Sequence, residues 1–254
     1  CQIEKEKKYL ERLELELNTV CAFSSWNPDH FLDVAEMAMG VSIAIDWCGE
    51  DLSPEVVRIA KESLIGKALK PSFREDYWWI NTNNNWNQVC HTGLSAAAIT
   101  VFEDVPELAS KTLSRAIKNL PLSMEAYAPD GAYLEGAMYW AYGTAYTLLA
   151  ISMYQSAFNT DFSISSQQGF VESATYIVVA HSPSGGAFNY SDSRATNGID
   201  FGIRSILAWF AKYSEDGMFL DEEVMINQIN RIKQSNVNED LVIDGNLRFS
   251  PFSL

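Results

Sequence analysis

The hydrophobic positions of the chain predict a series of helices, alternately amphipathic and apolar. In residues 3–22, apolar side chains recur every three or four positions with Glu and Lys between them, as in a helix with one buried face. Residues 30–48 are apolar nearly all round, as in a helix buried on most sides. The alternating pairs are 3–22 and 30–48, 54–70 and 85–103, and 106–119 and 135–158.

This alternation predicts an all-α protein built in two layers. Outer helices of a layered fold bury one face, whereas inner helices are covered on nearly all sides. An (α/α) toroid of helical hairpins has such an inner and an outer ring. An irregular helical bundle is the alternative that periodicity leaves open.

The rest of the chain is less regular. Pro121 is expected to end the helix that begins at residue 106, and a short helix should follow it to Tyr127. A Gly- and Ser-rich loop is expected at 182–198. The remaining predicted helices are 168–181, 200–213 and 221–232, and the candidate strands are 241–243 and 247–249.

Charge and hydropathy exclude some functions. The net charge of −15 argues against general nucleic-acid binding, which needs a basic surface. The longest apolar stretches are interrupted by polar residues, so no membrane span is predicted. No signal peptide is recognisable, and the chain begins inside a predicted helix, so we expect it to lack its natural N-terminal part.

No metal site or cofactor is expected. The cysteines have no metal-finger spacing and are expected to be buried thiols, with one disulfide as the alternative. The histidines are too scattered to predict a metal site. These residues are Cys1, Cys21, Cys48, Cys90, His30, His91 and His181.

The strongest candidate site is the amide-rich run from Asn81 to His91, which leads into a helix of small residues. On a helix that begins near Asn84, the side chains of Asn84, of Asn87 or Gln88, and of His91 would lie on one face. Free N–H groups in a first helical turn favour an anion such as a carboxylate. The alternative is that these amides cap the helix and support the neighbouring loop.

A second candidate lies between Asp130 and Thr144. Glu135 and Tyr139 are spaced i,i+4, so they share a helix face, and a tyrosine beside a carboxylate can transfer a proton. The alternative is an aromatic face packed in the core. A third candidate is the loop that leads to Arg194, where a plain surface loop is the alternative.

Tryptophans concentrate near the predicted loop–helix junctions, where aromatic faces suit sugar rings and equally suit packing between helices. These residues are Trp26, Trp47, Trp78, Trp79, Trp86 and Trp140.

Three motifs together resemble one enzyme family. They are Asn83-Asn84-Asn85-Trp86, Asp130-Gly131-(x)3-Glu135-(x)3-Tyr139 with Tyr142-Gly143, and Phe188-Asn189-Tyr190-Ser191-Asp192. Their order and spacing resemble the helical domain of the heparinase II/III-like and alginate lyase group of polysaccharide lyases.

The resemblance implies an (α/α) toroid, here incomplete, followed in the family by a β-sandwich domain. Residues 1–254 would then be one toroid domain, truncated at its N-terminus and without the β-sandwich. The implied location is periplasmic or secreted. The implied partner is an anionic polysaccharide containing uronic acid, cleaved by β-elimination without a cofactor.

The resemblance also implies roles for individual residues. Asn85, with Asn84, would neutralise the uronate carboxylate, and Tyr139 would protonate the leaving oxygen and could also be the base. In several family members a histidine directly follows the asparagine, whereas Trp86 stands there in this chain, so His91 is the second candidate base. The expected substrate-binding residues are Asn83, Trp86, Gln88, Trp78, Trp79, Tyr133, Glu135, Tyr142, Tyr190 and Arg194.

Two other functions remain open at this point. A glycoside hydrolase on a similar toroid would need a carboxylate pair, for which Glu135 with Asp192 or Asp130 are candidates. A non-catalytic carbohydrate-binding toroid is the other, and it is suggested by Trp86 in the place of a histidine.

Overall fold

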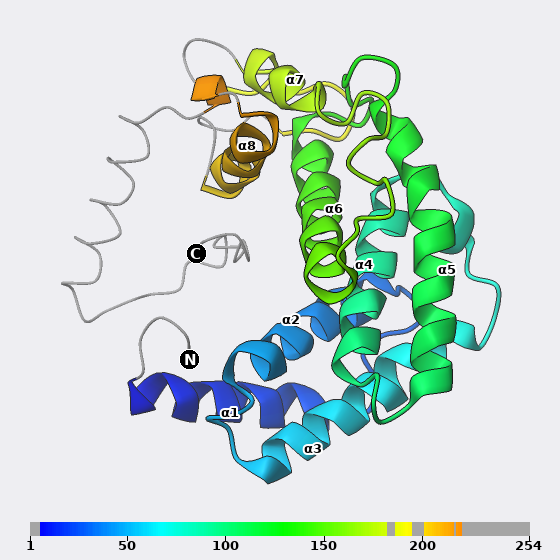
Figure 1. Ribbon diagram of the computed structural model, residues 1–254, viewed down its shortest axis with the longest axis vertical. Helices are drawn as coiled ribbons and strands as arrows, with labels where there is room; N and C mark the ends of the chain where they lie inside the picture. The colour runs from blue at the N-terminus through cyan, green and yellow to red at the C-terminus, as the bar shows by residue number, and fades with distance from the viewer. Residues whose placement is uncertain (1–5, 182–185, 195–200, 216, 220–254) are drawn as a thin grey trace. The chain divides into compact units, whose positions relative to one another are not determined.

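The computed structural model describes residues 6–181, 186–194, 201–215 and 217–219, and their regular secondary structure is helical (Figure 1). The described part holds no β-strand, and its one isolated bridge pairs His181 with Ala187. The all-α prediction is therefore confirmed. The α-helices are α1 (Lys7–Ala22), α2 (Leu32–Cys48), α3 (Pro54–Ser63), α4 (Asn85–Thr100), α5 (Pro106–Met124), α6 (Ala137–Phe158), α7 (Ser173–Val179) and α8 (Phe201–Ser214).

Short helical turns join several of these helices. Helix α3 continues as the π-helical segment η1 (Leu64–Leu69). Together, α3 and η1 correspond to the predicted helix at 54–70. The 3-10 turn η3 (Trp78–Asn81) leads to α4. The helix predicted at 221–232 and both candidate strands lie outside the described residues.

The prediction that Pro121 ends a helix is wrong. Helix α5 runs through Pro121 to Met124, and the 3-10 turn Glu125–Tyr127 follows. Proline removes one backbone hydrogen bond from a helix, at a cost of about 3 kcal/mol. Leu120 and Met124 on either side of Pro121 are buried, so packing of this end of α5 offsets the lost bond.

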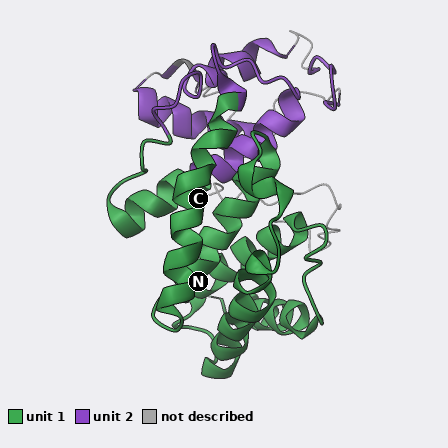
Figure 2. Ribbon diagram, turned by 90° about the vertical axis from the view of Figure 1, so that its right-hand side faces the viewer, with its two compact units in different colours: residues 1–125, 149–164 green, residues 126–148, 165–254 purple. Residues whose placement is uncertain are grey.

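The chain divides into two compact units (Figure 2). Unit 1 comprises residues 1–125 and 149–164, and unit 2 comprises 126–148 and 165–254. Helix α6 supplies residues to both units.

In unit 1, helices of like character pack on each other. The amphipathic helices α1 and α3 pack on each other, and the more apolar helices α2 and α4 do the same. Only two residues of α1 are buried, whereas α4 is buried from Asn85 to Ala98 except at Trp86. Helix α4 also packs against α5, so α4 is the central helix of this unit.

Gly93 allows α2 and α4 to approach closely. A Cβ atom at this position would lie 2.7 Å from the carbonyl carbon of Ala35 and 2.8 Å from its Cα. Cys21, Cys48 and Cys90 are buried and free, as expected for three of the four cysteines. None of the helices in the described ranges is long and apolar enough to cross a bilayer.

Candidate functional site

The amide-rich run forms the N-terminus of α4. Asn84 is the N-cap residue, and its Oδ1 accepts a hydrogen bond from the Trp86 backbone N–H at 3.1 Å. Its side chain is partly exposed, and its Nδ2 has no hydrogen-bond partner among the described residues. Asn83 beside it is exposed, whereas Asn85 is 2% exposed. Asn81, Asn83 and Asn84 are thus the asparagines of this run that solvent can reach.

Two other residues of the run join α4 to its neighbours. Nδ2 of Asn87 donates to the Ile80 carbonyl at 3.0 Å and to the Asn119 carbonyl at 3.2 Å. His91 Nε2 donates to the same Ile80 oxygen at 3.2 Å. These bonds tie η3 and α5 to α4, so part of the amide excess is structural.

His91 is wholly buried, and its environment keeps it neutral. Burial is the main cause that lowers the pKa of its imidazole to about 3. Gln88, one turn earlier on α4, is also buried. Both side chains are therefore out of reach of a polymer in solvent, and the burial assigns His91 to packing rather than to proton abstraction.

The three tryptophans around this helix start have different environments. Trp79 is fully buried, packed on Phe31 and His91, and the Arg115 guanidinium lies 5.5 Å from its ring centre. Trp78 is 57% exposed, and its ring centre lies 4.7 Å from that of the partly exposed Trp86. Trp78 and Trp86 therefore offer an aromatic surface beside the amides, and Trp79 does not.

His30, for which no role is predicted from the sequence, contacts this aromatic surface. The ring of His30 meets Trp86 edge-on, with centroids 4.9 Å apart. Its Nδ1 lies 2.9 Å from Oδ2 of Asp33, which also accepts from Nδ2 of Asn27 at 2.7 Å. In the sequence, the signal for this pair is a histidine three residues before an aspartate, at the start of a helix. From the sequence alone, His30 is weighed only as a possible metal ligand.

The second constellation lies in unit 2, at the start of α6. Tyr139 is in the first turn of this helix and is partly exposed, as is Glu135 just before it. The loop that ends at Arg194 closes on this turn, since Oγ of Ser193 accepts the Met138 backbone N–H at 3.3 Å. Gly136 has a φ of +92°, and a Cβ there would lie 2.6 Å from that of Ser193. The glycine thus permits the close contact that holds the loop beside Tyr139.

Hydrogen bonds between tyrosines also hold the loop that ends at Arg194. Tyr190 Oη donates to the Tyr133 carbonyl at 2.7 Å, and it lies 2.5 Å from Tyr176 Oη. Burial raises the pKa of the Tyr133 phenol well above its usual range, and Tyr133 is only 2% exposed. Tyr133 therefore acts through its backbone carbonyl, and its ring is part of the core.

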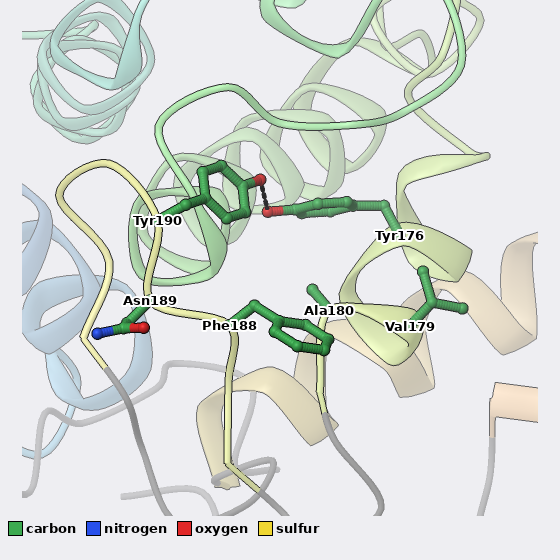
Figure 3. A pocket seen from close by; sticks show the side chains of 6 residues that line it. All are labelled: Tyr176, Val179, Ala180, Phe188, Asn189 and Tyr190. Atoms are coloured by element: carbon green, nitrogen blue, oxygen red, sulfur yellow. Dashed lines mark hydrogen bonds between the residues drawn. The ribbon is translucent and has the colours of Figure 1, made fainter.

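Tyr176 and Tyr190 also line an open hollow of about 610 Å³ in unit 2 (Figure 3). Phe188 points toward Val179 and Ala180, while the side chain of Asn189 points away from them. The hollow is mainly apolar, with the two tyrosine hydroxyls on one side.

The remaining predicted residues stand apart from these groups. Tyr142 packs edge-on against Tyr146, and Arg194 and Asp192 are exposed. Asp130 accepts the Ala132 backbone N–H at 3.2 Å, as a turn residue does. Within the described ranges, no group of three or more His, Cys, Asp or Glu side chains could hold a metal ion.

The structure therefore brings together two sets of predicted residues. Asn83, Asn84, Trp78 and Trp86 form one in unit 1, and Tyr133 with Tyr190 forms another in unit 2. Comparison with known proteins adds no family to this geometry: no family model matches the sequence, and no curated protein matches it significantly.

Proposed function

We propose that the protein is a polysaccharide lyase that cleaves a uronic-acid-containing chain by β-elimination, at the cell exterior or in the periplasm. The observation that carries the proposal is Asn84. Its Oδ1 is occupied by the helix cap, so the Nδ2 of this partly exposed side chain offers two N–H donors close to Trp86. Amide donors suit a uronate carboxylate, and exposed indole rings suit the C–H faces of sugars.

The chemistry assigned to these residues is electrostatic and acid–base. Donors from Asn84 would stabilise the negative charge that develops on the carboxylate when the neighbouring C–H bond ionises. The resemblance in sequence assigns the role of proton donor to Tyr139, which is partly exposed at the start of α6 in unit 2. Asn84 takes precedence over Asn85 because Asn85 is buried.

The fold proposed for this chemistry is an (α/α) toroid. Two successive hairpins of unit 1, α1–α2 and α3–α4, place like helices together, outer on outer and inner on inner. That arrangement is the repeating element of a two-layer helical ring. A single toroid domain over residues 1–254 remains a prediction.

Asn84→Ser is the sharpest test of the carboxylate-binding role. Serine keeps an oxygen that can cap α4, but it removes the amide donors, so stability should change little. We expect the rate of unsaturated uronate formation, followed by ultraviolet absorbance on alginate and glycosaminoglycans, to fall about 10²–10³-fold.

Tyr139→Phe removes the phenol hydroxyl that is the candidate proton donor. The same rate of unsaturated uronate formation should fall about 10²–10⁴-fold in this variant.

Matched controls separate these roles from general damage. Asn81→Ala removes another exposed amide of the same run, and Tyr146→Phe removes another hydroxyl of α6; both should keep the wild-type rate. Wild-type rates in Asn84→Ser or Tyr139→Phe would refute the corresponding role.

A non-catalytic carbohydrate-binding protein is the second candidate. The observation that favours it is the burial of His91, which removes one candidate base. Binding of uronate oligosaccharides without any product from the wild-type protein would select this alternative.

A further inference from the structure

The loop before α2 holds His30 in an unusual backbone setting. Asn27 and Phe31 have φ values of +56° and +57°. Asparagine tolerates this region, but a bulky residue such as phenylalanine adopts it at a cost of about 1–3 kcal/mol. Phe31 is 1% exposed and packs on Tyr77 and Trp79, so burial of its ring offsets this strain. The exposed His30 lies in this strained loop, between Asn27 and Phe31.

Asp33 fixes the tautomer of the His30 ring. Partial burial alone would raise the pKa of the Asp33 carboxyl, but hydrogen bonds from His30 and Asn27 outweigh it, and the pKa is lowered. The carboxylate is therefore ionised and can only accept hydrogen bonds. Nδ1 of His30 must then donate the proton of the 2.9 Å contact. In the neutral imidazole this leaves Nε2 as a bare proton acceptor.

Trp86 connects this ring to the proposed carboxylate-binding amide. Its backbone N–H donates to Asn84, and its indole contacts His30 with an angle of 78° between the ring planes. Trp86 thus contacts both His30 and Asn84, and the exposed Trp78 packs against the same indole. No hydrogen-bond partner for His30 Nε2 lies in the part of the chain that the structure describes.

We infer that His30, oriented by Asp33 and Asn27, is the general base that removes the proton next to the uronate carboxylate. The inference rests on the proposed function and names a residue for its unassigned step. Nε2 takes the C5 proton, and the C–H electron pair forms the C4–C5 double bond. The C4–O bond breaks, and its oxygen takes a proton from solvent water. Exchange with solvent then returns the His30 ring to its starting protonation state.

The test is His30→Gln, which removes the base while keeping a polar side chain at an exposed position. The rate of elimination should fall about 10²–10⁴-fold, with the affinity for uronate oligosaccharides unchanged. Added imidazole should restore part of the rate. His181→Gln is the matched control and should keep the wild-type rate. The Nδ1–H of His181 donates to the Ile177 carbonyl, and His181 belongs neither to the Trp78–Trp86 surface nor to the Tyr139 region.

Asp33→Asn tests the orientation of the ring. An amide can donate to Nδ1 and so move the ring proton to Nε2, which would block proton abstraction. We expect a loss of at least about tenfold, accompanied by a change of tautomer visible in the imidazole nitrogen chemical shifts. A side chain with a merely structural role would not couple these two measurements.

Two outcomes separate the inference from the proposed function. A wild-type rate in His30→Gln would overturn the inference and leave the lyase intact, whereas a wild-type protein without turnover on any uronate polymer would overturn both.

Discussion

Gly93→Ala is expected to destabilise unit 1 by at least about 2 kcal/mol, the reverse of what alanine normally does inside a helix. Helix propensity alone favours alanine over glycine by about 1 kcal/mol. At Gly93, however, the added Cβ would meet backbone atoms of Ala35 on α2, 2.7 and 2.8 Å away. Backbone cannot move aside as a side chain can, so α2 and α4 must separate. Urea denaturation of the two proteins measures the difference.

Gly40→Ala is the matched control, because Gly40 lies on α2 and a Cβ there would meet no atom within 4 Å. The propensity gain should therefore appear without a clash, and the variant should be more stable by about 0.5–1 kcal/mol. Stabilisation of similar size in both variants would contradict the close α2–α4 packing.

His91 is expected to make the folded protein sensitive to acid. Its pKa falls from 6.5 in the unfolded chain to about 3 in the fold, mainly because the ring is buried. Between these values the unfolded chain binds the proton and the folded protein does not, so stability decreases as the pH falls through this window. One pKa unit corresponds to about 1.4 kcal/mol, so the full loss is roughly 4–5 kcal/mol.

His91→Gln isolates this contribution from that of the carboxylates. The glutamine amide can still donate to the Ile80 carbonyl, but it does not titrate. We expect the unfolding free energy of the wild type to fall more steeply than that of the variant, by about 1.4 kcal/mol for each pH unit between 6 and 4. Parallel curves over this range would show that His91 is solvated or already protonated in the fold.

The helices of unit 1 could be predicted from sequence because they depend on local periodicity. The predicted helix at 85–103 corresponds to α4, which is buried from Asn85 to Ala98 except at Trp86. The path of α5 through Pro121 could not be predicted in this way. It depends on the burial of Leu120 and Met124, which is a tertiary effect.

The candidate site was only partly predictable for the same reason. The excess of amides was visible, but the division between Asn84 at the surface and Asn87 in the interior depends on partners from η3 and α5. His30 could not be predicted because its contact with Trp86 joins residues far apart in sequence, and its position depends on the left-handed backbone at Phe31. The local sequence indicates only its partner Asp33.

The most direct measurement is the fate of water when the wild-type protein cleaves a uronate polymer in water enriched in heavy oxygen. The account predicts products with an ultraviolet-absorbing unsaturated uronate at the new non-reducing end and no heavy oxygen gained in the cleavage step, because elimination consumes no water. Saturated products that carry the label from the cleaved bond would identify a hydrolase and contradict the account.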